Sequence, residues 1–193
     1  MLTQFLRNIN WVDVIVVFVF LRTIFYSVKS GFVAEGWRFI GTMVAIFFSF
    51  HCYAYWAQVL FTRFKLPILK WEFLLFTAFW AIVSFLFWLT AIGVNILFKL
   101  EVNHHVIDKY AAGFLGAARG ILVCSLTVFA VLLLQNDFFH CQALTSYGYQ
   151  LLAKAAPNTY LLEFKSLVVK LFEGQQFNQD VFAVLSGHGV NPK

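Results

Sequence analysis

Residues 108–134 read DKYAAGFLGAARGILVCSLTVFAVLLL, and after Lys109 the only charged side chain in this stretch is Arg119. A helix needs roughly 20 mostly apolar residues to cross the hydrocarbon core of a bilayer. The stretch from Tyr110 to Leu134 meets that length, so we expect it to span a membrane. Three earlier stretches meet it as well: Trp11 to Val28, Phe32 to Trp56 and Trp71 to Phe98.

The composition agrees with four spans. Apolar residues make up 61% of the 193-residue chain and charged residues 12%, whereas a soluble domain has about a quarter charged residues. We therefore expect an all-α polytopic membrane protein with four transmembrane helices. The first apolar run follows Arg7 as in a signal peptide, but it contains Asp13 and lacks a small-residue cleavage site, so we expect the protein to keep it as a span.

The pattern changes after residue 136, where apolar residues recur at helical spacing instead of forming a continuous run. This predicts a four-span membrane domain over residues 1–136 and a tail of amphipathic helices at the membrane surface over residues 137–193. We expect Pro157 to end the first tail helix, and a last short helix to be capped by Gly187 or Gly189. The two predicted apolar stripes are Leu144, Tyr147, Leu151 and Ala155, and then Tyr160, Phe164, Leu167 or Val168, and Leu171.

The net charge of +5 belongs to the membrane part. Residues 1–136 hold ten Lys and Arg against five Asp and Glu, while residues 137–193 hold four of each. Basic residues near the ends of spans meet phospholipid headgroups and influence orientation. The expected partners are therefore the lipid bilayer and either other copies of the chain or other membrane proteins, and no nucleic acid.

The second span has one face of small or polar residues. Glu35 and Arg38 are three positions apart on this face, close enough to pair along the helix. Such a face suits close helix packing or a wet crevice better than contact with lipid. Its members are Gly31, Glu35, Arg38, Thr42, Ala45 and Ser49, and the third span has a similar face at Thr77, Ala81, Ser84, Ala91 and Asn95.

The fourth span carries Gly113, Gly116 and Gly120 along one line, where a neighbouring backbone can approach closely. We expect this groove to receive the first or the second span. Arg119 lies at the edge of the groove and needs an acid partner at membrane depth. The candidates are Glu35, Asp13 and Asp108, and the alternative is that Arg119 extends to the headgroups.

The cysteines and histidines leave several interpretations open. His51–Cys52 and His140–Cys141 follow the second and fourth spans, so they should share one side of the membrane. A disulfide, a His2Cys2 zinc site or two unrelated pairs are all compatible with that placement. The cluster of His104, His105 and Asp108 lacks the spacing of a metal or catalytic motif. We expect no cofactor, no metal and no catalytic residue.

Two stretches carry a resemblance to a known family: WVDVIVVFVFLRTIFYSVKSGFVAEGWR near the start and VIDKYAAGFLGAARGILV in the fourth span. Their order and spacing resemble those of the colicin V production protein (CvpA) family of small bacterial inner-membrane proteins. Lys29 and Ser30 stand where arginine or glycine often precedes the Gly-Phe pair. The matching positions are Asp13, Gly31, Phe32, Glu35, Asp108, Gly116, Arg119 and Gly120.

The resemblance implies a role in the production or export of colicin V, a bacteriocin, and in maintenance of the cell envelope. It also implies that both termini lie outside the cytoplasm, since some relatives carry an external protease after the four spans. Within this frame we expect a non-enzymatic protein of the inner membrane. The alternative is a small channel or transporter with a polar path lined by spans two to four.

Overall fold

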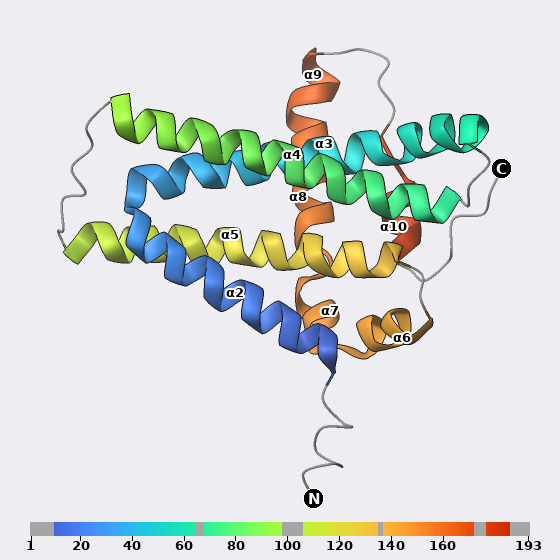
Figure 1. The fold of residues 1–193 in the computed structure, drawn as a ribbon, viewed down its shortest axis with the longest axis horizontal. Helices are drawn as coiled ribbons and strands as arrows, with labels where there is room; N and C mark the ends of the chain where they lie inside the picture. Colours follow the sequence, from blue (N-terminus) through green and yellow to red (C-terminus); the bar gives the residue numbers. More distant parts are fainter. Residues whose placement is uncertain (1–9, 65–67, 98–105, 135–136, 172–176, 186–193) are drawn as a thin grey trace, which may run out of the picture.

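The computed structural model describes residues 10–64, 68–97, 106–134, 137–171 and 177–185. Four long helices lie roughly along one direction, and a chain of shorter helices crosses them (Figure 1). The long helices are α2 (Trp11–Ser30), α3 (Phe32–Phe64), α4 (Ile68–Leu97) and α5 (Val106–Leu133). The shorter ones are α6 (Asp137–Thr145), α7 (Tyr147–Leu152), α8 (Ala155–Glu163), the π-helical segment η1 (Phe164–Val168), α9 (Val169–Leu171) and α10 (Asp180–Leu185).

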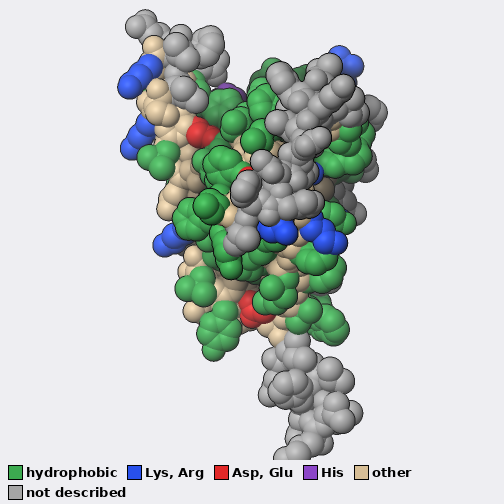
Figure 2. Space-filling view, turned by 90° about the vertical axis from the view of Figure 1, so that its left-hand side faces the viewer, with side chains coloured by type: hydrophobic (Ala, Val, Ile, Leu, Met, Phe, Trp, Pro, Cys, Tyr) green, Lys and Arg blue, Asp and Glu red, His purple; other side chains and the backbone are tan. Residues whose placement is uncertain are grey.

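The four long helices are apolar and long enough to cross a membrane, over Trp11–Ser30, Phe32–Arg63, Trp71–Gly93 and Ile107–Leu133. The predicted all-α polytopic membrane fold is therefore confirmed. The second helix continues eight residues past its predicted end at Trp56, to Phe64. In Figure 2, which views the bundle from the end where α2 meets α3, hydrophobic side chains cover much of the surface, and charged ones lie in small separate groups.

The turn between α2 and α3 is made by Gly31 alone. Its φ of 81° and ψ of 164° lie in a region that is essentially restricted to glycine. The chain turns at Gly31, but the two helices pack little against each other beyond this turn. Instead α2 packs along α5, and α3 packs along α4 (Figure 1).

An aromatic cluster holds the helices together at the level where α8 crosses them. Phe50 of α3, Phe76 of α4 and Phe129 of α5 are fully buried, and the rings of Phe50 and Phe129 are 4.8 Å apart. Tyr160 of α8 places its ring 5.7 Å from that of Phe50. Aromatic side chains bury large areas and prefer such edge-to-face and tilted pairs, so this cluster docks the tail onto the bundle.

The second predicted stripe of the tail therefore faces the protein: Tyr160, Phe164 and Val168 are buried. The side chain of the last member of the stripe, Leu171, lies outside the described part of the structure. The last helix is present as α10, and its proposed caps, Gly187 and Gly189, lie outside the described residues.

The prediction that one helix carries the first tail stripe was wrong. Ser146 interrupts it, because the Ser146 hydroxyl accepts from Tyr149 N at 2.9 Å and caps the new helix α7. Tyr147 and Leu151 are strongly exposed, whereas Leu144 and Ala155 are partly buried against the core. Pro157 does not end a helix but lies in the first turn of α8, where a backbone N–H has no partner within the helix and proline is tolerated.

Candidate functional site

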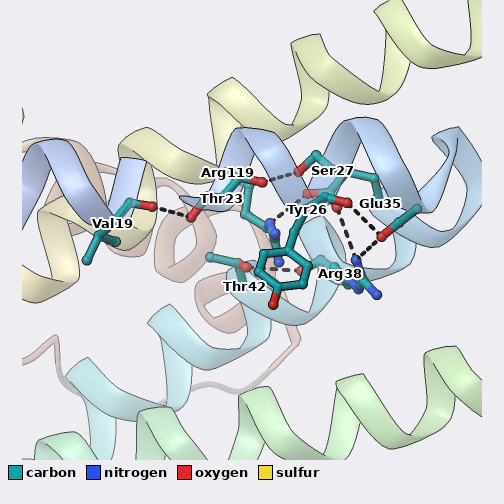
Figure 3. Close-up of polar contacts among 9 residues, drawn as sticks. Val19, Thr23, Tyr26, Ser27, Glu35, Arg38, Thr42 and Arg119 are labelled. Carbon is teal, nitrogen blue, oxygen red and sulfur yellow. Dashed lines mark hydrogen bonds and ion pairs between the residues drawn. The ribbon is translucent and has the colours of Figure 1, made fainter. Parts of the chain in front are cut away.

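A carboxylate at the start of α3 is the centre of the site. Glu35 lies in the first turn of this helix, and its side chain is 0% exposed. Its Oε1 is 2.6 Å from Nε of Arg119 on α5, and its Oε2 is 3.7 Å from Nη1 of Arg38 one turn further along α3. Figure 3 shows Glu35 between the two guanidinium groups. Of the three acids considered for Arg119, Glu35 is the one it contacts.

The interaction is an ion pair rather than an aligned hydrogen bond. The Arg119–Glu35 distance is short. However, the two Glu35 carboxylate oxygens and Arg119 Nε all lack a partner with hydrogen-bond geometry among the described residues. Arg38 Nη1 donates to Ser30 Oγ at 2.6 Å, whereas its Nε is buried and has no such partner in that part of the chain. Two guanidinium groups thus share one carboxylate, which leaves the cluster with a net positive charge.

The glycine line of α5 receives α2. A Cβ atom at Gly116 would overlap Oγ and Cβ of Ser27, and one at Gly120 would lie 2.9 Å from the ring of Phe20. The absence of side chains at these two positions is what allows the backbones of α2 and α5 to approach. At Gly113 the approach is looser, since a Cβ there would be 3.4 Å from Val28.

The helix that fills the groove is therefore not the helix that supplies the acid. Ser27 on α2 occupies the groove, and its hydroxyl donates to Thr23 O of its own helix at 2.7 Å. Glu35 reaches Arg119 from α3 instead. The groove and the ion pair are therefore formed with two different neighbours of α5.

The two other predicted acids hold backbone groups. Asp108, in the first turn of α5, accepts from Phe32 N at 3.1 Å and so caps the start of α3 beside Gly31. Asp13 Oδ1 accepts from Gly148 N at 2.8 Å, and its Oδ2 accepts from Tyr147 N at 3.3 Å. Both carboxylates accept from N–H groups in the first turn of a helix, which have no partner within that helix.

A cavity of about 850 Å³ lies beside the ion pair and has walls from all four long helices. Arg38 and Arg119 line it, as does Arg22 of α2. The wall from α4 includes part of the polar face predicted for the third span. The hydroxyl-bearing residues that line the whole cavity are Thr23, Tyr26, Thr42, Thr77, Ser84 and Thr127.

Several of these features could not be found from the sequence. Ser27 and Arg22 carry no motif, and only the packing of α2 on α5 reveals their roles. Glu72 of α4 is also buried, at 4% exposure, and its Oε2 has no hydrogen-bond partner among the described residues. Its only sequence signal is a lone acid next to Trp71, near the predicted end of a span.

The histidines and cysteines do not form a site in the described part of the chain. Cys52, Cys124 and Cys141 are all free there, and no group of three potential metal ligands occurs. His51 Nδ1 lies 3.2 Å from the Tyr160 hydroxyl. His104 and His105 lie outside the described residues, and so does the side chain of His140.

Four apolar helices around a buried ion pair define a multi-pass membrane protein. The family described as colicin V production protein has a model that matches residues 12–157, from the first turn of α2 to the first turn of α8. The chain belongs to this family. Comparisons with curated proteins and with solved structures gave no match.

Proposed function

We propose that the protein is a non-enzymatic component of the bacterial inner membrane that acts in colicin V production or export and in maintenance of the cell envelope. The observation that carries this proposal is the family match over residues 12–157. The match includes every helix that contributes to the Glu35 cluster, and it includes Asp13 and Asp108.

The roles of the acidic groups support a non-enzymatic function. Glu35 balances two arginines, Asp108 caps α3, and Asp13 accepts from two backbone groups of α7. A general acid or base needs a proton-exchanging group within reach of a substrate. These three carboxylates are instead occupied in joining one helix to another, as in a protein that works by its shape and its contacts.

The proposed orientation has both termini outside the cytoplasm. This orientation follows from the relatives that carry an external protease after the four spans. Single cysteines at residues 104 and 193 of a variant without native cysteines test this. An impermeant thiol reagent added to intact spheroplasts should label residue 193 and spare residue 104, and the opposite pattern would reverse the orientation.

The proposed partners are lipid and either a second copy of the chain or another membrane protein. Most of α4 is not covered by the bundle, and its exposed apolar side chains suit lipid or a neighbouring helix: Ile82, Phe85, Leu86, Trp88 and Leu89. For the tail, we propose contact with the membrane surface. Exposed Leu162 and Val169 lie near exposed Lys165 and Lys170 on α8, η1 and α9, a composition that suits the headgroup boundary.

The alternative, a small channel or transporter, rests on the cavity between the four long helices. Polar groups within a membrane commonly line a path for a solute or ion. The family match does not favour this alternative. Flux measured in vesicles that contain only the purified protein would distinguish it, because a protein that acts through contacts alone should give no flux above that of empty vesicles.

The proposed function can be tested by complementation. A colicin V-producing strain that lacks its own family member should regain its inhibition zone on a sensitive lawn when this chain is expressed. Glu35→Gln should restore the zone less well, whereas Arg63→Gln, an exposed change at the end of α3, should restore it fully. If the wild-type chain accumulates in the membrane and the zone does not return, the proposed role in colicin V production is wrong.

A further inference from the structure

The cavity between the four long helices has an excess of positive charge. Three arginines line it, and no Asp or Glu is among its described lining residues. Glu35 contacts Arg38 and Arg119 from beside the cavity and can balance only one of them. Arg22 has no ion pair within the described chain, and its guanidinium lies over the ring of Tyr26, 5.6 Å from the centroid. The surplus is therefore two positive charges.

These arginines lie deep in the proposed membrane layer. With a rise of about 1.5 Å per residue, Arg22 lies about 12 Å along α2 from Ser30. By the same measure, Arg119 lies about 16 Å along α5 from Asp108, which caps α3 at the turn. Since the hydrocarbon core is about 30 Å thick, both positions are close to its middle, where an unbalanced arginine is costly.

The cavity is open at the protein surface between α2 and α4. Arg22 and Tyr26 on the first of these helices are exposed, and so are Ala81, Ser84 and Trp88 on the second. A ligand could thus enter from the side without separating the tightly packed pairs α2–α5 and α3–α4.

The lining offers donors suited to an oxyanion. Guanidinium groups match the geometry of phosphate oxygens and often bind two at once. Arg22 lines the cavity, is exposed and has no ion pair within the described chain, so its guanidinium has donors to offer. Ser84 adds a hydroxyl group from the facing wall.

We propose that this cavity binds a phosphate group, which would be carried by an anionic phospholipid or by a free phosphate. Two surplus positive charges suit a group that carries between one and two negative charges near neutral pH. The inference does not depend on the role in colicin V production, because it rests on the charge, depth and opening of the cavity.

The experiment uses the full-length protein in an uncharged detergent and reads the fluorescence of Trp80 and Trp88, which both line the cavity. One arm adds inorganic phosphate, with sodium chloride at the same ionic strength as its control. The other arm adds dioleoylphosphatidylglycerol to the micelles, with zwitterionic dioleoylphosphatidylcholine as its control. Trp80→Phe and Trp88→Phe identify which signal comes from the cavity.

We expect a saturable response to at least one of the two phosphate probes and none to its control. A response to the phospholipid alone identifies a lipid headgroup as the ligand, and a response to inorganic phosphate alone identifies a free anion. Arg22→Gln and Arg38→Gln should each weaken binding about tenfold or more, as expected when one charge-assisted contact is lost. Ala81→Phe, which adds bulk to the α4 wall, should also weaken it, whereas Arg63→Gln, which lies outside the cavity, should not.

Arg22 is exposed, so Arg22→Gln tests the proposal even if Arg38→Gln fails to fold. The proposal is overturned if neither probe gives a saturable response, or if chloride and phosphatidylcholine act equally well. It is also overturned if Arg22→Gln binds as tightly as the wild type.

Discussion

Arg119 on α5 and Glu35 on α3 form an ion pair at 2.6 Å, and the acid is completely buried. Arg38 approaches the same carboxylate from the other side, at 3.7 Å. Removing one partner of a buried pair leaves an uncompensated charge, which costs more than the pair itself contributes. The cluster should therefore be sensitive to any change that alters its balance of charge.

The first prediction concerns this balance. Glu35→Gln should lower the free energy of unfolding by about 3 kcal/mol, because it leaves two adjacent guanidinium groups without an acid. Glu35→Gln combined with Arg119→Gln should cost less than the sum of the two single changes, since one positive charge is removed as well. Unfolding of the purified protein in mixed micelles measures all three. Strict additivity would mean that the two residues are not coupled.

The second prediction compares two glycines of the same helix face. Gly116→Ala should destabilise the protein by about 1–3 kcal/mol, because its Cβ would overlap Ser27. Gly113→Ala has ordinary contact distances, so it should be neutral or stabilising by up to about 1 kcal/mol. Adding Ser27→Gly to Gly116→Ala should recover part of the loss, since it removes the overlapping atoms. Equal effects of the two alanine variants would show that α2 does not fill the groove at Gly116.

The comparison of these glycines also shows what the sequence could and could not predict. The spacing of Gly113, Gly116 and Gly120 predicts that some backbone approaches, because that depends only on helix geometry. The spacing does not identify the neighbouring helix, since the first and the second span could each pack into the groove. The sequence also does not decide which of three acids pairs with Arg119, because pairing between helices depends on tertiary packing.

The sequence predicts well those features that depend only on residues close together in the chain. Apolar length predicts the four spans, and Gly31 ends α2 because few other residues adopt its conformation. The tail was harder, because Ser146 and Pro157 can each begin or end a helix and the sequence alone does not decide which. The cavity combines residues from four helices, so no single stretch indicates it.

The third prediction concerns the link between α2 and α7. Asp13→Ala should leave the N–H groups of Tyr147 and Gly148 without their acceptor, at a cost of about 1.5–3 kcal/mol. Hydrogen exchange at these two amides should become faster, while exchange within α3 should not change. Asp13→Asn keeps one acceptor oxygen and should give an intermediate effect. Unchanged exchange in Asp13→Ala would show that this carboxylate does not hold α7.

The last prediction concerns pH and Glu163 at the end of α8, outside the spans. Burial disfavours the charged carboxylate and raises the pKa of Glu163 to about 7. Its Oε2 has no hydrogen-bond partner among the described residues to offset this. The folded protein therefore takes up a proton more readily than the unfolded chain, so this contribution to stability is present at acidic pH and is lost as the pH rises through about 7.

The melting temperature in detergent should accordingly be higher near about pH 5 than near about pH 8, the range that brackets this raised pKa. Glu163→Gln removes the titrating group and should reduce the difference, mainly by raising the melting temperature at the higher pH. Lys165→Gln, which changes an exposed residue two positions away, should leave the difference as it is in the wild type. If Glu163→Gln has the same pH dependence as the wild type, the carboxyl is not desolvated, and α8 does not pack against the bundle closely enough to bury it.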